Sequence, residues 1–458
     1  MNLMTSINNR SVFLLLFAFF LLTGERSIAG DSNQTRMLSM DSAIALGLAH
    51  SHEVQFSSAQ LAEVTSSYAD IKNKLIPSVV LAAGYTRLSN IPTEYFAIPG
   101  FPGEIPSTAL FPVILNNYSA TASLAESIFN GFLLKNAMTN MEFTEKSAEY
   151  NVESKKKDVT LNVINTYLEL FKLQQSYQLV EESLQQIAAH VKEVGDFAKD
   201  GLATQNDLLR VKLQQSNAEL SEIDIRNQLL SINFNLDVML GLPENTSIKV
   251  DSASIMESKS IQALPYYIQK AGQNREDIQA SDMQQKAAEA GIKEAQSDLY
   301  PKVSIAADYD YLRPNPRIVP PLDQFQPTWD IGIRISYSLT DLYNNKNKTD
   351  VSRAKYAEAE ANYAQLNDRA KMEINQSYLE YQQSLEKIEV AAKSLTQAEE
   401  NYKLVKSRYD NHISLITDLT DANNYLLNAQ ISFISSKADA QLAYYKLLKS
   451  AGELNTKK

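Results

Sequence analysis

Between Phe132 and Asp200 the apolar positions follow the period of a single, very long helix. This stretch holds one glycine, Gly195, and no proline. At about 1.5 Å per residue the helix would span about 100 Å, which is longer than a compact domain can enclose. Its C-terminal part places apolar or small residues in alternating steps of three and four, the spacing of a seam that faces neighbouring helices. This seam consists of Tyr177, Val180, Leu184, Ile187, Val191, Val194 and Ala198.

A second helix is predicted to fold back along the first. Asp200 and Gly201 interrupt the helical pattern, which restarts at Thr204 and continues to Gly241. Helices joined by so short a turn lie side by side and antiparallel. The turn is therefore expected at one far end of a long rod.

The same arrangement occurs twice in the chain, which indicates an internal duplication. Moving the first seam by 211 residues places it on a second set with the same apolar phase. Identical residues at this shift include Tyr167 with Tyr378 and Asp207 with Asp418. The second seam consists of Ile388, Ala391, Leu395, Ala398, Tyr402, Val405 and Tyr409.

Each repeat also contains two stretches in which apolar residues alternate with polar ones, as in strands with two different faces. They cover about residues 78–88 and 118–127 in the first repeat and about 302–312 and 329–339 in the second. Strands of about ten residues with one apolar face suit a transmembrane β-barrel with lipid outside and water inside. A soluble two-faced hairpin packed on a helix is the alternative. The clearest apolar face has aromatic ends and consists of Trp329, Ile331, Ile333, Ile335 and Tyr337.

Four strands are too few to close a barrel, and open sheet edges are not tolerated in lipid. Three copies of the chain would supply twelve strands, whereas two would supply eight, which gives a barrel too narrow for a conduit. The predicted fold is mainly α with a small membrane β part, built from a duplicated helix–strand–strand–long helix–helix repeat. Three chains then form a twelve-stranded β-barrel that continues into a long α-helical barrel.

The ends of the chain and the join between the repeats complete the predicted organisation. Residues 1–29 read as a secretory signal peptide, because the apolar run 11–22 is too short to cross a bilayer as a helix and precedes Ser27-Ile28-Ala29, a cleavage pattern. The other segments are a first repeat, an inter-repeat linker, a second repeat and a tail: 30–241, 242–273, 274–451 and 452–458. The long helices and their return helices are expected at about 131–200, 204–240, 341–410 and 413–450.

Composition argues against several classes of protein. Loss of Arg10, Glu25 and Arg26 with the signal peptide reduces 43 basic and 54 acidic residues to 41 and 53, so a nucleic-acid partner is not expected. The absence of cysteine excludes a disulfide framework, a thiol nucleophile and a lipid anchor on cysteine. The four histidines are scattered, and the sequence has neither a phosphate loop nor a nucleophile elbow. We therefore expect no metal, no cofactor and no enzymatic activity.

Carboxylates just after the two turns are the candidate functional residues. Asp207 follows the first turn, and Asp418 and Asp421 follow the second. One interpretation is local, because Thr204 and Asp207 have the spacing of a capping box and acids in a first helical turn complement the helix dipole. The other uses symmetry. If three chains bring their turns together, Asp418 and Asp421 would form rings of carboxylates that favour cations at the opening.

These features together resemble the TolC family of outer-membrane efflux and secretion channels. The resemblance covers essentially the whole mature chain. It implies a homotrimer of a Gram-negative bacterium, with its barrel in outer-membrane lipid and its helical tunnel in the periplasm. The motifs that carry it are Leu75-Ile76-Pro77 and Leu299-Tyr300-Pro301, Ile128-Phe129-Asn130-Gly131, a Tyr-Leu-Glu in each long helix, Gly201-Leu202-Ala203-Thr204 before Asp207, and Leu240-Gly241.

The family's role implies an exit duct of a tripartite efflux pump or a type I secretion system, conducting small molecules or proteins passively. Its partners would be a periplasmic adaptor (membrane fusion protein) and an inner-membrane transporter of the RND, ABC or MFS type. By the same resemblance, Asp418 and Asp421 narrow the periplasmic aperture, and Tyr409 links to Asp207 in the closed gate. The turns that would contact the adaptor consist of Gly201, Leu202, Ala203, Thr204, His412, Ile413 and Ser414.

Two residues depart from the family pattern at the second turn. His412 stands where a glycine is expected, and Ser414 replaces a basic residue of the gate. Part of the latch is therefore expected to differ in this chain. Two rival functions stay open at this point. One is an exported coiled-coil spacer or tether of the cell envelope without channel activity, which explains the rods but not the alternating strands. The other is a soluble helical-repeat binding protein.

Overall fold

The computed structural model describes residues 35–90, 92, 95–97, 99–100, 102–106, 113–244, 246–251, 255, 259–411 and 413–455. The predicted signal peptide lies outside the described residues, as do His412 and the last three residues of the predicted tail.

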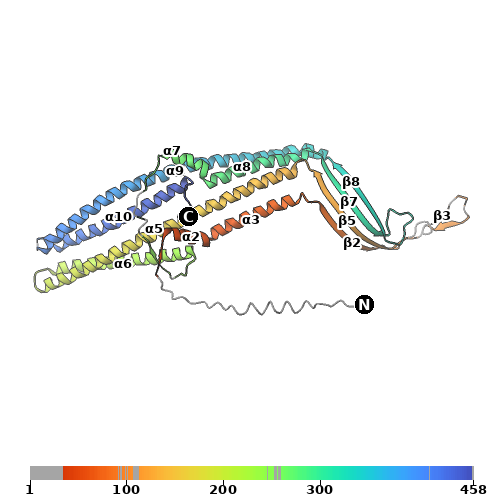
Figure 1. Ribbon diagram of the computed structural model, residues 1–458. Coiled ribbons are helices and arrows are strands. Elements are labelled where there is room, and N and C mark those ends of the chain that lie inside the picture. The colour runs from red at the N-terminus through yellow and green to blue at the C-terminus, as the bar shows by residue number, and fades with distance from the viewer. Residues whose placement is uncertain are drawn as a thin grey trace, which may run out of the picture.

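The molecule is a long, gently curved rod of helices with a small sheet at one end (Figure 1). Each repeat runs through a pair of helices, two strands of the main sheet, one very long helix and a shorter return helix. The first repeat contains α2 (Met40–His50), α3 (His52–Asn73), β2 (Ser78–Arg87), β5 (Asn116–Phe129), α5 (Leu133–Lys199) and α6 (Gln205–Leu240). The second contains α7 (Leu264–Asn274), α8 (Glu276–Ala295), β7 (Lys302–Arg313), β8 (Gln326–Ser336), α9 (Leu339–Asp410) and α10 (Ile416–Ser450). The predicted mainly helical fold with a duplicated repeat is confirmed.

The two seams face neighbouring helices. In α5, which has 67 residues, Val180, Ile187 and Val194 are buried and the other seam residues are half-buried. In α9, which has 72 residues, Ala398 is buried and the rest of its seam is half-buried. Neither helix could bury an apolar stripe by itself, so the antiparallel partners α6 and α10 cover the two seams, and α3 and α8 pack along other parts of the long helices.

The main sheet joins the two repeats. Its four strands are antiparallel in the order β2-β5-β7-β8, so β5 of the first repeat pairs with β7 of the second. Strand β8 covers 326–336 instead of the expected 329–339. The alternation of apolar residues continues past its end, but Ser338 accepts a hydrogen bond from the Asp341 backbone N–H and begins α9. A short 3₁₀ turn, η1 (Gln296–Leu299), precedes β7.

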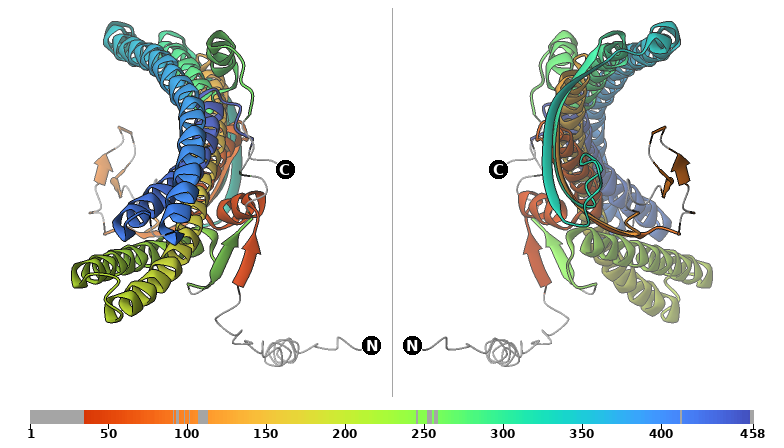
Figure 2. Two further views of the ribbon diagram at one scale, coloured as in Figure 1. Left: turned by 90° about the vertical axis from the view of Figure 1, so that its left-hand side faces the viewer. Right: turned by 90° about the vertical axis from the view of Figure 1, so that its right-hand side faces the viewer.

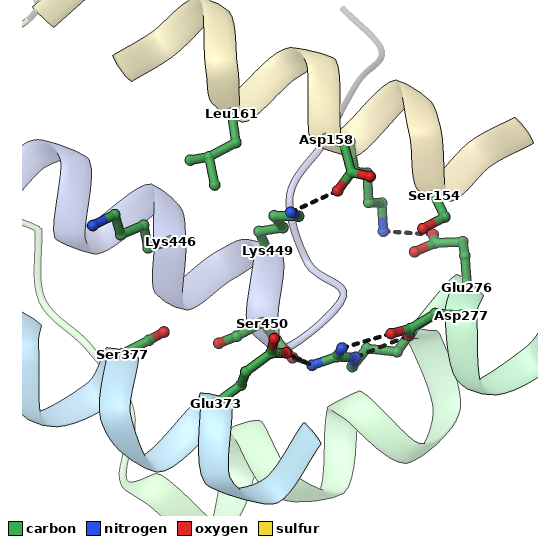
Figure 3. A pocket seen from close by; sticks show the side chains of 12 residues that line it. Ser154, Asp158, Leu161, Glu276, Asp277, Glu373, Ser377, Lys446, Lys449 and Ser450 are labelled. Atoms are coloured by element: carbon green, nitrogen blue, oxygen red, sulfur yellow. Dashed lines mark hydrogen bonds and ion pairs between the residues drawn. The ribbon is translucent and has the colours of Figure 1, made fainter. Parts of the chain in front are cut away.

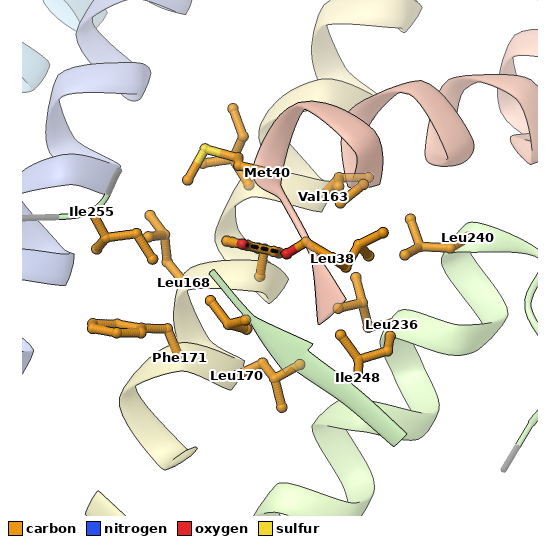
Figure 4. Packing of buried hydrophobic residues seen from close by; sticks show 14 of the residues in the cluster. Leu38, Met40, Val163, Leu168, Leu170, Phe171, Leu236, Leu240, Ile248 and Ile255 are labelled. Atoms are coloured by element: carbon orange, nitrogen blue, oxygen red, sulfur yellow. Dashed lines mark hydrogen bonds between the residues drawn. The ribbon is translucent and has the colours of Figure 1, made fainter. Parts of the chain in front are cut away.

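A compact core lies near the middle of the rod (Figure 4). Here β1 (Thr35–Leu38) pairs in parallel with β6 (Ser247–Val250), a strand in the predicted linker. The Tyr167 hydroxyl of α5 donates to the Leu38 carbonyl at 2.8 Å and accepts from the Asp251 N–H at 3.1 Å. The N-terminal strand and the linker are thus fixed to the long helix of the first repeat.

Two minor features complete the described chain. A two-stranded hairpin of β3 (Tyr95–Ala97) and β4 (Glu104–Pro106) extends beyond the main sheet (Figure 1). Among the helices that the structure describes, none is both long and apolar enough to cross a membrane.

Candidate functional site: the paired helical turns

The two turns lie side by side at the end of the rod opposite the sheet (Figure 1). A small apolar cluster holds the four long helices together there. Its buried members are Ile187 and Val194 of α5, Val211 of α6, and Ile416 and Leu419 of α10. Half-buried side chains of α9, including that of Tyr409, pack against the cluster.

The first turn is closed by backbone bonds and then by a reciprocal cap. The N–H groups of Leu202 and Ala203 donate to the Phe197 carbonyl at 2.8 and 3.2 Å, and Gly201 takes the left-handed conformation with φ +76°. The Thr204 hydroxyl oxygen accepts from the Asp207 N–H at 3.1 Å, while the Asp207 carboxylate accepts from the Thr204 N–H at 3.1 Å and from its hydroxyl at 2.6 Å. The predicted capping box is confirmed.

These bonds also set the acidity of Asp207. The hydrogen bond from the Thr204 side chain, followed by the bond from its backbone N–H, lowers the pKa of Asp207 below its usual 3.8. The carboxylate is therefore ionised at neutral pH, and its hydrogen bonds cap the start of α6.

The second turn repeats the backbone of the first. The N–H groups of Ile413 and Ser414 donate to the Arg408 carbonyl at 2.8 and 3.3 Å, and these positions match those of the first turn at the same shift of 211 residues. The cap differs. Asp418 accepts from the Leu415 N–H at 3.2 Å and from the Ser414 hydroxyl at 2.9 Å, but Leu415 has no side-chain oxygen to return a bond.

The predicted aperture residues lie on the exposed side of α10. Asp418 and Asp421 are exposed, whereas their neighbours Ile416 and Leu419 point into the apolar cluster. Asp421 makes no hydrogen bond or ion pair with any residue that the structure describes. In the first repeat the matching position is Arg210. A ring of these carboxylates needs further copies of the chain, so it stays a prediction.

The structure does not bring the predicted gate partners together. The Asp207 carboxylate is occupied by Thr204, and within the described residues the Tyr409 hydroxyl forms no hydrogen bond with it. The Tyr409 ring instead meets that of His190 edge-on, with 6.1 Å between ring centroids. Burial raises the pKa of the Tyr409 hydroxyl to about 12, helped by Glu193 and Asp410.

Sequence reasoning missed an ionic network near the middle of the rod (Figure 3). Arg275, only 8 % exposed, binds Asp277 through two nitrogens at 3.0 and 2.6 Å. It also donates to Glu373 at 2.6 Å and to the Ser450 carbonyl at 3.2 Å. Although burial acts in the opposite direction, Arg275 lowers the pKa of Asp277. The network ties the α7–α8 junction to α9 and α10.

Two further ion pairs extend this network to α5. Lys157 binds Glu276 at 2.5 Å, and Lys449 binds Asp158 at 2.6 Å. The run Arg275-Glu276-Asp277 gave no signal in the sequence, because alternating charges at a helix start are usually solvated. Only the folded chain reveals that Glu276 meets Lys157 of α5 and that Arg275 meets α9 and α10.

A buried carboxylate was also unforeseen. Asp237 of α6 is fully buried, and one of its oxygens has no partner among the described residues. The other accepts from the Asn233 amide at 3.1 Å. Burial raises the pKa of Asp237 to about 6. Its place in the helical pattern resembles that of any solvated acid, so the sequence carried no sign of it.

Residues 43–242 and 267–453 match the family described as outer membrane efflux protein. The chain is 21 % identical over 378 residues to toxin and drug export protein A of Aggregatibacter actinomycetemcomitans, an alignment that covers 79 % of each chain. It is 24 % identical over 349 residues to the probable efflux pump outer membrane protein TtgC of Pseudomonas putida, covering 74 % of this chain and 70 % of the relative.

Solved structures share the fold. The outer membrane protein VceC of Vibrio cholerae matches with a TM-score of 0.73 and 20 % identity, over 90 % of this chain and 96 % of its own. The CmeC outer membrane channel of Campylobacter jejuni matches with a TM-score of 0.74 and 15 % identity, over 91 % and 86 %. These matches confirm the predicted fold and family. The chain therefore belongs to the outer membrane efflux protein family, as a non-enzymatic transport channel of the Gram-negative outer membrane.

Proposed function

We propose that three copies of this chain form the exit duct of a tripartite efflux pump or a type I secretion system. An outer-membrane efflux component works with pump partners. Here these partners would be a periplasmic adaptor and an inner-membrane transporter of the RND, ABC or MFS type. The names of the relatives, a toxin and drug export protein and a probable efflux pump protein, support transport of small molecules or proteins outward.

The observation that carries the proposal is the incomplete sheet. Strands β2 and β8 form its two edges, and within the described residues neither edge has a second partner strand. Unpaired backbone groups are costly in lipid, so an open four-stranded sheet cannot be the final state of a membrane protein. Pairing β2 of one copy with β8 of the next would close the sheet, and three copies would give twelve strands around a lumen.

The surface of the sheet supports the same arrangement. On β8 the side chains of Trp329, Ile331, Ile333 and Ile335 are 71 %, 63 %, 72 % and 70 % exposed and project from one face. Lipid would cover this apolar face, while the opposite face, which carries Asp308 and Asp330, would line water.

At the other end of the rod the turns would meet the adaptor, and the second turn would form the aperture. In this proposal Asp418 and Asp421 of three chains line the opening and favour cations. The link between Tyr409 and Asp207 would form in the closed state, when the α9–α10 pair moves toward the α5–α6 turn. Adaptor contacts at Gly201–Thr204 and 412–414 would then release the gate.

The test is single-channel conductance of detergent-purified protein in planar bilayers. We expect a small, cation-selective conductance that multivalent cations block, and loss of both block and selectivity in the double variant Asp418→Ala, Asp421→Ala. The matched control removes two exposed acids of α9 far from the turns, Asp350→Ala and Asp368→Ala, and should change neither property. Protein that inserts but conducts identically after the first double change would place the constriction elsewhere. Failure to insert would favour an envelope tether.

A further inference from the structure

The loop between β7 and β8, residues 314–325, folds back over the sheet instead of extending away from it. Its first turn is fixed by Asn315, which is 1 % exposed. The Asn315 amide donates to the Gln326 carbonyl and the Thr328 hydroxyl at 3.1 Å each, and its oxygen accepts from the Arg317 N–H at 2.9 Å. The right-hand view of Figure 2 shows the loop against the concave side of the sheet.

Arg317 fastens this loop to two strands. Its guanidinium forms an ion pair with Asp330 of β8 and another with Asp310 of β7 at 3.4 Å. It also donates to the Trp329 carbonyl at 3.5 Å. Asp308 lies directly opposite Asp330 in the strand register, and like charges at opposed positions destabilise a sheet. Arg317 supplies the cation that this acidic group needs.

The alternation of side chains along each strand shows which face of the sheet Arg317 contacts. Side chains alternate between faces along a strand. Asp308, Asp310 and Asp330 are therefore on the face opposite to that of Tyr309 and Trp329, whose exposed aromatic rings belong to the apolar side. The segment around Arg317 consequently covers the polar face, which would line the lumen of the proposed trimer. At the end of the loop, Phe325 stacks on Tyr311 of the apolar side.

We propose that this loop is an outer gate of the duct and that Arg317 is its latch. The inference rests on the proposed function, since it needs the polar face to surround a lumen. Contacts other than those of the Arg317 side chain hold both ends of the loop, at Asn315 in its first turn and at Asp323 and Phe325 at its end. Arg313 binds Asp323 at 2.8 Å, and Phe325 stacks on Tyr311 with 5.0 Å between ring centroids. Release of Arg317 would thus free the middle of the loop while its ends stay in place.

The latch is electrostatic and accessible. The side chains of Arg317 and Asp330 are 46 % and 49 % exposed, so dissolved ions screen their attraction. An exported cationic molecule would compete with Arg317 for the same carboxylates, and the acids that it uncovers would favour passage of cations. The outer end of the duct thereby gains a selectivity step separate from the predicted aperture at the helical turns.

The absence of cysteine makes a direct test possible, because one introduced thiol is the only one in the protein. Ala306→Cys places a thiol on the polar face of β7, opposite Gly332 and closer to the helices than Asp308. Whole cells carrying the assembled protein are treated with a bulky, membrane-impermeant maleimide, and the labelling rate is measured. We expect Arg317→Glu to raise the rate about tenfold. High ionic strength should also raise it in the otherwise unchanged protein.

Two further variants sharpen the test. Adding Asp330→Arg to Arg317→Glu restores opposite charges across the latch and should slow labelling again. Arg87→Glu makes the same charge change on β2 at the same end of the sheet, where Arg87 bonds only Asn116 among the described residues, and should leave the rate unchanged. If the thiol is labelled equally fast with Arg317 and with Arg317→Glu, and the protein conducts as a trimer, only the proposed latch is overturned. A monomer that does not conduct would overturn the proposed duct and the gate with it.

Discussion

The α5–α6 turn and the α9–α10 turn are copies in their backbone, and they differ in how the following helix is capped. In each, two successive N–H groups donate to the carbonyl five residues before the first of them. In the first turn Thr204 and Asp207 cap each other reciprocally. In the second, the Asp418 carboxylate accepts from the Ser414 hydroxyl and the Leu415 N–H, but no side chain in the described part of the chain accepts a bond from the Asp418 N–H.

This difference indicates how the duplicated turns have diverged. The acid of the first turn is used for local structure, and Arg210 one turn later adds a positive charge. The second turn keeps a weaker cap and replaces that arginine with Asp421, which has no partner among the described residues. A carboxylate without a local partner is available to a passing ion. Of the two predicted aperture acids, Asp421 is therefore the stronger candidate, and Asp418 serves the helix as well.

The largest expected effect comes from replacing Asp421 with arginine, the residue that Arg210 supplies at the matching position after the first turn. Asp421→Arg would change the proposed ring from three negative to three positive charges. Unit charges about 4 Å apart interact by about 1 kcal/mol in water, so the cation-to-anion permeability ratio should fall by about tenfold or more. The reversal potential in a salt gradient measures this. Arg210→Ala is the control and should have no effect; an equal shift there would place both turns at the aperture.

Removing the Tyr409 hydroxyl should have the next largest effect. If Tyr409 bonds Asp207 in the closed gate, Tyr409→Phe removes a hydrogen bond worth about 1 kcal/mol net in each subunit. Openings in planar bilayers should become about fivefold more frequent per link lost. Tyr343→Phe is the control, because Tyr343 is an exposed tyrosine at the other end of α9. An unchanged open probability would mean that Asp207 serves only to cap α6, as it does in the structure.

Sequence reasoning succeeded where a local pattern set the buried face of a helix or the cap at its start. The alternating steps of three and four place Val180, Ile187 and Val194 in the buried seam. The Thr204 to Asp207 spacing predicts the cap that forms. It failed where contacts join distant parts of the chain. Arg275 meets Glu373, and the fold alone brings these residues together.

The end of β8 shows a different kind of failure. Alternation of apolar residues continues through Tyr337, so the pattern predicts a strand that ends later than the one observed. The helix begins at Ser338 because the Ser338 side chain accepts a hydrogen bond from the Asp341 N–H, which would otherwise be unpaired. A periodic pattern gives the face that a residue occupies, and capping chemistry decides where the element ends.

Changing the helix caps should have a smaller effect, seen in the amide hydrogen exchange at the starts of α6 and α10. Thr204→Ala removes the reciprocal cap at a cost of about 1 kcal/mol, so the first amides of α6 should exchange with solvent about fivefold faster. Leu415→Thr should give α10 the missing acceptor and slow exchange there by a similar or smaller factor. Leu415 is 69 % exposed, so the change costs little packing. Faster exchange in α10 after Leu415→Thr would contradict the comparison.

The smallest expected effect is the pH dependence of the first cap. The pKa of Asp207 is lowered from 3.8 in the folded chain, chiefly by the Thr204 side chain, so its cap stabilises the turn above that pH. The stabilisation is lost as the pH falls through the lower folded value, because the protonated carboxyl accepts hydrogen bonds poorly. Amide exchange of α6 in the unchanged protein and in Asp207→Asn should therefore differ at neutral pH and converge below 3.8. Comparing the two at each pH cancels the intrinsic pH dependence of exchange. A difference that persists in strong acid would mean that Asp207 acts through its shape and not its charge, and the contrast between the two turns would then rest on Arg210 and Asp421 alone.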